Sequence, residues 1–192
     1  MNSVSIKTDY VDNLAKAVNS INQEDIDKIC DIIEEVRKDG GLVFTAGNGG
    51  SSCIAQHLAE ELTEVASRDI EKELQHYKCI CLSSNQGLLT CIANDEGYKN
   101  IFIRQCLRYK NPLHKNCFIG FTTSGNSQNI HEVIKETALS PIIIFTGDNG
   151  IGYDQDNLIV IKIDSDITHV IEDCFQICVH LIWLTLQERN KK

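Results

Sequence analysis

The stretch LVFTAGNGGSSCIAQHLAEEL (42–62) contains the change of pattern that decides the fold. Its first six residues, 42–47, form a short apolar run, which is typical of a strand buried inside a parallel sheet. The glycine-rich turn GNGGS (47–51) follows directly. Apolar residues then recur at helical spacing, which predicts a helix over 51–66. Strand, tight turn and helix in this order form the repeating unit of α/β proteins.

The same alternation continues to the end of the chain. We predict strands at 42–47, 77–84, 117–123, 141–147 and 157–164, and helices at 51–66, 86–93, 97–109, 127–138 and 169–187. Helical periodicity also predicts amino-terminal helices over about 8–38, closed by Gly40 and Gly41. The pattern predicts a parallel sheet covered by helices on both faces. The carboxyl ends of its strands are then where ligands bind.

Length and composition restrict the class of protein. With 192 residues and 42% hydrophobic residues, we expect a single compact domain over 1–192. The net charge is −9 and the basic residues form no stripe, which argues against nucleic-acid binding. No run of about 18 apolar residues occurs, so we expect no contact with membranes. The sequence MNSVSIKTDY (1–10) lacks the apolar core of a signal peptide, which predicts a cytoplasmic protein.

Nine cysteines are spread along the chain without a CxxC pair. Most of them lie in apolar segments, so we interpret them as reduced, buried side chains rather than as disulfides or as a thiolate zinc site.

The turn GNGGS (47–51) has two interpretations. Adjacent glycines let a ligand approach the backbone, and the free N–H groups of a helix start attract an anion. The motif is neither a dinucleotide fingerprint nor a Walker loop. An ordinary turn between a strand and a helix fits equally well.

The turn TTSGNS (122–127) carries a stronger signal. It brings four hydroxyl groups and Gly125 to the end of the third strand, and the hydroxyls belong to Thr122, Thr123, Ser124 and Ser127. Helix N-capping requires only one hydroxyl. Hydroxyls and backbone amides without a basic side chain suit a phosphate monoester, so we predict phosphate binding here.

Histidine and glutamate pairs occur on two of the predicted helices. His57 and Glu61 are one turn apart and share a face, as two metal ligands often do. Glu172 and His180 lie on the last helix, about 80° apart around the axis and about 12 Å apart along it. That separation is awkward for one ion. Each histidine alone also fits an ordinary hydrogen-bonded imidazole.

Together these motifs resemble the sugar isomerase (SIS) domain family, and most closely its phosphoheptose isomerases. The resemblance rests on GNGGS (47–51), AQHLAEELT (55–63), ANDEGY (93–98), TSGNS (123–127) and the segment from residue 172 to residue 180, in this order along nearly the whole chain. It implies a three-layer αβα sandwich with a five-stranded, flavodoxin-like parallel sheet. It also implies a homotetramer with sites between subunits.

The implied activity is aldose–ketose isomerisation of sedoheptulose 7-phosphate to a heptose 7-phosphate, a step toward bacterial surface heptoses. Glu61 would be the base and His180 the acid, and one zinc ion per subunit would lie among His57, Glu61, Glu172 and His180. Glu61 thus has two expected roles, as ligand and as base. The resemblance assigns the sugar phosphate to a wider set of residues, namely Asn48, Gly49, Gly50, Ser51, Glu61, Asn94, Asp95, Thr122, Thr123, Ser124, Ser127 and Glu172.

Three departures from the family bear on the substrate. Glu64, Val65 and Ala66 stand where the family usually has glycine, a basic residue and an aromatic residue. His169 replaces a frequent aspartate, and Glu172 replaces the usual glutamine.

Two other functions stay open. One is a non-catalytic SIS regulator that binds a protein, such as a replication initiator, or a sugar phosphate. The other is an isomerase of hexose or pentose phosphates without zinc.

Overall fold

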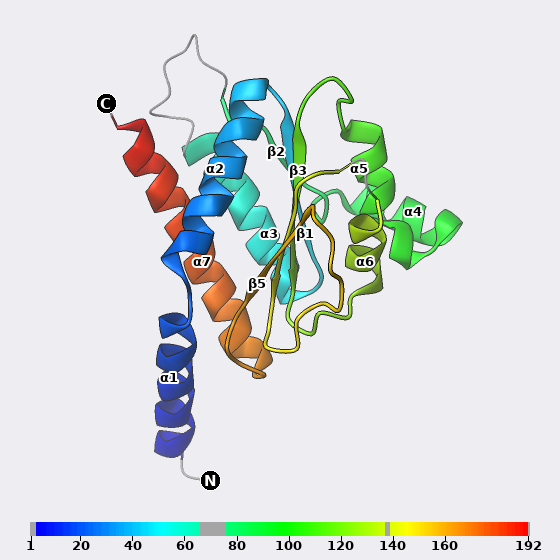
Figure 1. Cartoon of the computed structure of the whole chain (residues 1–192). Coiled ribbons are helices and arrows are strands. Elements are labelled where there is room, and N and C mark those ends of the chain that lie inside the picture. Colours follow the sequence, from blue (N-terminus) through cyan, green and yellow to red (C-terminus); the bar gives the residue numbers. More distant parts are fainter. Residues whose placement is uncertain (1–2, 66–75, 137–138, 192) are drawn as a thin grey trace.

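A computed structural model describes residues 3–65, 76–136 and 139–191 of the chain (Figure 1). The helices and strands alternate as the sequence predicts. Their bounds are α1 Ser3–Asn19, α2 Gln23–Asp39, β1 Leu42–Gly47, α3 Gly50–Glu60, η1 Glu61–Val65, β2 Cys79–Cys81, α4 Gln86–Glu96, η2 Tyr98–Asn100, α5 Ile103–Tyr109, β3 Asn116–Thr122, α6 Gln128–Ile134, β4 Ile142–Thr146, β5 Leu158–Lys162 and α7 Thr168–Asn190.

The five strands form one parallel sheet in the order β2-β1-β3-β4-β5. The chain moves outward from β1 to β2, then crosses to the other side of β1 to form β3. The strand order therefore reverses between β1 and β3, and the loops that leave these two strands diverge to opposite faces. This is the flavodoxin-like order, so the predicted fold class is confirmed.

Alternating side chains divide the core into two layers. Ile119, Phe121 and Phe145 face a cluster with α2, α3 and α7, whereas Phe118 and Ile144 face a cluster with α5 and α6. Figure 1 shows α2, α3 and α7 on one side of the sheet and α4, α5 and α6 on the other, with α1 extending beyond the sheet. The result is the predicted three-layer sandwich.

Several boundaries differ from the sequence prediction. The helix predicted over 86–93 extends to Glu96, and the helix predicted over 97–109 is divided into the 3-10 helix η2 and the α-helix α5. The helix predicted over 51–66 ends its α-helical part at Glu60 and continues as the π-helical turn η1, while Ala66 lies outside the described residues. The helix predicted over 127–138 ends at Ile134, and 137–138 also lie outside them. Strand β2 has three residues instead of eight, and it lies at the edge of the sheet, where only β1 pairs with it.

Helix α7 is a core helix. Within the described residues it is the helix whose length and hydropathy would allow it to cross a membrane, although the sequence contains no uninterrupted apolar run. Its buried residues, among them Ile171, Phe175 and Ile182, belong to the same cluster as those of α2 and α3. Packing inside the protein therefore explains its apolar composition.

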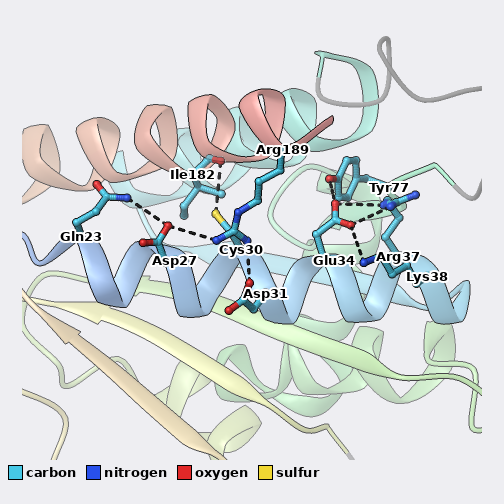
Figure 2. A network of polar contacts seen from close by, with 10 residues as sticks. All are labelled: Gln23, Asp27, Cys30, Asp31, Glu34, Arg37, Lys38, Tyr77, Ile182 and Arg189. Carbon is cyan, nitrogen blue, oxygen red and sulfur yellow. Dashed lines mark hydrogen bonds and ion pairs between the residues drawn. The ribbon is translucent and has the colours of Figure 1, made fainter. Parts of the chain in front are cut away.

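A polar network joins α2 to the carboxyl-terminal end of α7 and to Tyr77, just before β2 (Figure 2). Arg37 is 8% exposed and donates to Glu34 at 2.8 Å, while the Tyr77 hydroxyl donates to the same carboxylate. Asn190 donates to the Tyr77 oxygen at 3.0 Å, and Arg189 pairs with Asp31 at 2.8 Å. Burial alone would raise the pKa of Glu34, but hydrogen bonds from Arg37 and Tyr77 outweigh it and hold that pKa below its usual value.

We predict that Glu34→Ala lowers the free energy of unfolding by about 3 kcal/mol at pH 7, because it removes the carboxylate that faces a buried guanidinium. Since folding lowers the pKa of Glu34, its contribution is complete above the unfolded pKa of about 4.3 and is lost as the pH falls through the folded value. Urea unfolding at pH 7 and below pH 4 measures both effects. Glu132→Ala breaks an exposed pair with Lys135 and is the control, with an expected loss below about 1 kcal/mol. Equal losses in the two variants would contradict the role of the network.

Candidate active site

The loop after β1 is held tightly against the start of α3. Gly49 has φ 54°, a value that L side chains rarely adopt, and a Cβ on Gly47 would lie 2.4 Å from the Ser51 carbonyl oxygen. Ser83, which follows β2, donates to the Gly47 carbonyl at 2.9 Å. The backbone conformation thus requires glycine at position 49, and the close approach of the Ser51 carbonyl requires it at position 47.

The loop after β3 carries the predicted hydroxyl groups, and some of them contact one another or the loop backbone. Thr122 Oγ1 and Ser127 Oγ are 3.0 Å apart, and the Asn126 N–H donates to Ser124 Oγ at 3.2 Å. Ser127 precedes α6, but its side chain makes no capping hydrogen bond. Helix capping therefore does not account for this hydroxyl, and the interpretation as a phosphate loop gains support.

Gly125 fixes the shape of this second loop. Its φ is 69°, and a Cβ there would lie 1.8 Å from the Gly150 carbonyl oxygen. His131 Nε2 lies 2.7 Å from the Gly125 carbonyl oxygen, so the imidazole N–H can donate to it. His131 is therefore an ordinary hydrogen-bonded histidine, whose partner is the backbone of the loop after β3.

Two residues that the sequence analysis did not select connect the loops. Asn129, in the first turn of α6, exchanges hydrogen bonds with Asn48 at 3.0 and 2.9 Å. Tyr98, in η2, donates to Asn48 Oδ1 at 2.8 Å. Neither residue type is a common acid, base or metal ligand of active sites. Only the position of Tyr98 in the ANDEGY motif gave a signal.

His57, Glu61 and His180 form a cluster on α3, η1 and α7. One potential ligand atom from each lies within 4.8 Å of the others. His57 Nε2 is 3.2 Å from Glu61 Oε1, and the rings of His57 and His180 are 5.3 Å apart. Gln176 lies one turn before His180 and contacts its Nε2 at 3.1 Å. Helix α7 thus brings His180 to the pair predicted on α3.

Glu61 is the first residue of η1, the π-helical turn that continues α3. Such turns widen a helix by one residue, and they are frequent at functional sites. The Glu61 side chain is 13% exposed, and its Oε2 is buried with no hydrogen-bond partner among the described residues. A buried carboxylate oxygen without a partner is costly, unless a proton, a cation or a substrate meets it.

The cluster fits a divalent metal ion. Two imidazoles and a carboxylate are a common set of zinc ligands, and three protein ligands leave a coordination position open for water or substrate. The orphaned Glu61 Oε2 is the observation in this structure that favours a cation.

Glu172 lies at the glycine loop and is not part of this cluster. Ser51 donates to its Oε1 at 3.3 Å, and both of its carboxylate oxygens lie 2.6 Å from where a Cβ on Gly50 would be. The separation expected along α7 thus agrees with the structure. The Glu172 carboxylate thus faces the glycine loop, and both of its predicted roles, as a metal ligand and as a sugar contact, stay predictions.

Asn94 and Asp95 lie at the end of α4 and are exposed. Asn94 Nδ2 donates to Asp95 Oδ1 at 2.8 Å, and the Cys91 thiol contacts Asp95 at 3.6 Å. In the described part of the chain they make no hydrogen bond to either loop. Tyr98, three residues further on, is the member of this motif that reaches the site. Contact of Asn94 and Asp95 with the sugar stays a prediction.

A family model described as the SIS domain matches residues 8–143. The chain belongs to the SIS domain family. It is 33% identical to the "Probable phosphoheptose isomerase" of Thermoplasma acidophilum over 185 residues, which is 94% of this chain and 97% of the relative. It is also 33% identical to the phosphoheptose isomerase of Aquifex aeolicus over 83% of this chain and 82% of the relative.

Solved structures of SIS proteins agree with the fold. A phosphoheptose isomerase from Francisella tularensis superposes with a TM-score of 0.83, covering 98% of this chain and 100% of the other, at 23% identity. The resemblance inferred from the motifs is therefore confirmed, and the SIS fold extends over nearly the whole chain.

We predict that Gly125→Ala destabilises the protein by more than about 3 kcal/mol, because backbone strain adds to overlap with the Gly150 carbonyl. It should also abolish thermal protection by inorganic phosphate. Gly87→Ala is the matched control, since a Cβ there meets only Asn85 Oδ1 at 3.6 Å. Alanine in that helix should be neutral or stabilising by up to about 1 kcal/mol. Urea unfolding measures the loss of stability, and melting curves with and without phosphate measure the thermal protection. A Gly125→Ala variant that phosphate still protects against heat would contradict the proposed shape of the loop.

Proposed function

We propose that this SIS protein is an aldose–ketose isomerase that converts sedoheptulose 7-phosphate to D-glycero-D-manno-heptose 7-phosphate, for bacterial surface heptose synthesis. The observation that carries the proposal is the cluster of His57, Glu61 and His180, which α3, η1 and α7 bring together. The names of relatives that match over almost the full length support the same substrate.

The reaction moves a proton between two neighbouring carbons through an enediol. It needs a base, an acid and a means to stabilise negative charge on oxygen. We assign the base to Glu61, whose Oε2 is buried without a partner and can accept the proton. We assign the acid to His180, which lies on the opposite helix, is exposed and is oriented by Gln176.

The loop from Thr122 to Ser127 holds the phosphate in this proposal. Hydroxyls of Thr122, Thr123, Ser124 and Ser127 and the backbone N–H groups near Gly125 would donate to its oxygens. The loop from Asn48 to Ser51 and the carboxylate of Glu172 would meet the sugar hydroxyls. The phosphate and the sugar hydroxyls then lie at the switch point between β1 and β3, on the loops that leave these two strands.

His57, Glu61 and His180 would hold one zinc ion per subunit. When bound, zinc polarises a carbonyl or hydroxyl oxygen. Glu61 has two carboxylate oxygens, so the roles of ligand and of base do not exclude each other. The chain's own groups still supply the proton transfers.

We further propose that residues 1–192 form one SIS domain that assembles as a homotetramer. Large apolar side chains are exposed on α1 and α7, namely Ile6 at 59%, Val11 at 51% and Leu184 at 49%. His180 is exposed on the same helix as Leu184, so a neighbouring subunit there would enclose the site.

Nine free cysteines support a reducing cytoplasm, and burial raises the pKa of Cys30, Cys117 and Cys178 to about 12, which keeps these thiols protonated.

A non-catalytic regulator remains the alternative function. A regulator needs the fold and the loops, but it has no need of a buried, unpartnered carboxylate beside two imidazoles. The cluster therefore favours the enzyme over the regulator.

We predict that the protein converts sedoheptulose 7-phosphate to an aldose phosphate, observed by NMR, and that Glu61→Gln lowers kcat at least about 100-fold, because an amide cannot accept the proton. Glu60→Gln is the matched control. Glu60 is the exposed neighbour of Glu61, and its variant should retain the wild-type rate. A fully active Glu61→Gln variant would refute the assigned base. A wild type that binds the substrate without converting it would favour the regulator.

We predict that zinc affinity depends on the cluster of three. His57→Ala and His180→Ala should each weaken zinc binding at least about tenfold, whereas Glu172→Gln should leave it within about threefold of wild type. The sequence alone would have predicted a loss for Glu172→Gln, since a second carboxylate attracts a cation more than an amide does. Competition with a chelating dye measures the affinity. A loss in Glu172→Gln as large as in His57→Ala would make Glu172 a ligand.

A further inference from the structure

The loop proposed to hold the phosphate contains no charged side chain. Residues 122–127 read TTSGNS, so the side chains offer neutral hydrogen bonds alone. A phosphate monoester carries a charge of about −1.5 to −2 at pH 7. The chain itself has a net charge of −9, which repels such an anion at long range. A cation close to the loop would offset this repulsion.

Lys162, the last residue of β5, lies in one row with the ends of β3 and β4. Thr122 pairs with Thr146, and Thr146 pairs with Lys162, in the register of the parallel sheet. The residue before each of them belongs to the core cluster of α2, α3 and α7. Because side chains alternate along a strand, all three residues face the other side of the sheet, where α6 lies. The row spans two strand spacings, about 10 Å.

The loop after β4 connects this lysine to the loop after β3. The N–H of Gly147 donates to the Thr123 carbonyl at 3.2 Å. A Cβ on Gly125 would lie 1.8 Å from the Gly150 carbonyl oxygen. A Cβ on Gly150 would lie 2.9 Å from Cε and 3.1 Å from Nζ of Lys162. The ammonium group of Lys162 therefore packs over Gly150, the residue that contacts the loop after β3.

The charge of Lys162 is not paired. Lys162 is exposed, and in the described part of the chain its side chain takes part in no ion pair or hydrogen bond. By contrast, Lys135 on α6 pairs with Glu132 at 2.8 Å. Asp164, two residues after Lys162, pairs with Lys16 at 3.6 Å. The ammonium group of Lys162 is thus available to an anion on the neighbouring loop.

We infer that Lys162 is the cation of the phosphate site, which attracts the dianion of the substrate to the hydroxyls of the loop after β3. The inference deepens the proposed function and rests on its assignment of the phosphate to this loop. An ammonium group is a point charge, so it attracts a phosphate through space without a fixed hydrogen-bond geometry. Such an attraction near the protein surface weakens as salt is added. The site should therefore prefer phosphate monoesters to neutral sugars and to singly charged sulfate esters of the same shape.

Variants of Lys162 separate charge from shape. At low ionic strength we expect Lys162→Met to raise the KM for sedoheptulose 7-phosphate and the Kd for inorganic phosphate about fivefold. The kcat should stay within about twofold of wild type, because the charge acts on binding and not on the proton transfer. Lys162→Glu should raise both constants further, whereas Lys162→Arg keeps the charge and should stay within about twofold. The Kd follows from the rise of the melting temperature with phosphate concentration.

Two controls accompany these variants. Lys78→Met removes one charge from an exposed lysine just before β2, at the amino-terminal edge of the sheet, and should match wild type. In about 1 M sodium chloride, where the Debye length is about 3 Å, the difference between Lys162→Met and wild type should fall below about twofold. A difference that salt leaves unchanged would contradict attraction through space.

The outcomes separate this inference from the proposed function. A wild type that converts the substrate, with the same KM and phosphate Kd in Lys162→Met, would overturn the role of Lys162 and leave the isomerase intact. Equal weakening in Lys162→Arg or in Lys78→Met would also overturn that role. A wild type that does not convert sedoheptulose 7-phosphate, but binds phosphate more tightly than Lys162→Met does, would overturn the isomerase and retain the cation. A wild type that phosphate does not protect against heat would overturn both the phosphate loop and the role of Lys162.

Discussion

The reversal of strand order between β1 and β3 is the constraint on which the site depends. All five strands are parallel, so their carboxyl ends lie at one edge of the sheet. Because α3 covers one face and α6 the other, the loops after β1 and β3 turn to opposite faces of the sheet, and the hydrogen bonds between Asn48 and Asn129 join the two sides. Both loops begin on strands that are hydrogen-bonded over six residue pairs, from Leu42 opposite Asn116 to Gly47 opposite Phe121. Both loops therefore start from the centre of the sheet.

Helices α3 and α7 supply the remaining side chains of the site. Helix α3 leaves the glycine loop and carries His57 to Glu61, where the π-helical turn begins. Helix α7 packs along α3 and brings His180 to the same point and Glu172 to the start of α3. The core helix that resembles a membrane segment by composition is thus also the helix that supplies half of the site. Its burial fixes both residues relative to the sheet.

Much of this arrangement could be predicted from the sequence, because it depends on strong local patterns. Apolar runs located the four longer strands within one or two residues at each end, and the motif order predicted the family. The short edge strand β2 was overestimated, because β-propensity extends beyond the residues that find a partner. The π-helical turn after Glu60 leaves no periodic signal. Asn129 and Tyr98 could not be selected from the sequence, because neither an amide nor a phenol forms a recognisable motif here. Both form hydrogen bonds with Asn48, which lies 81 and 50 residues away from them in the chain. Glu172 could be placed on α7, but not against Gly50, since spacing along a helix does not fix what faces it.

The central claim is that this site moves a proton between two carbons through an enediol. Isomerisation of sedoheptulose 7-phosphate by the wild type in D2O tests it most directly, with ¹H NMR of both sugars after partial conversion. The account predicts that solvent deuterium enters the aldose at C2 and the recovered ketose at C1, because the base exchanges its proton with water between the two transfers. An aldose formed at full rate without deuterium would show direct transfer of hydrogen between the carbons and would contradict the account.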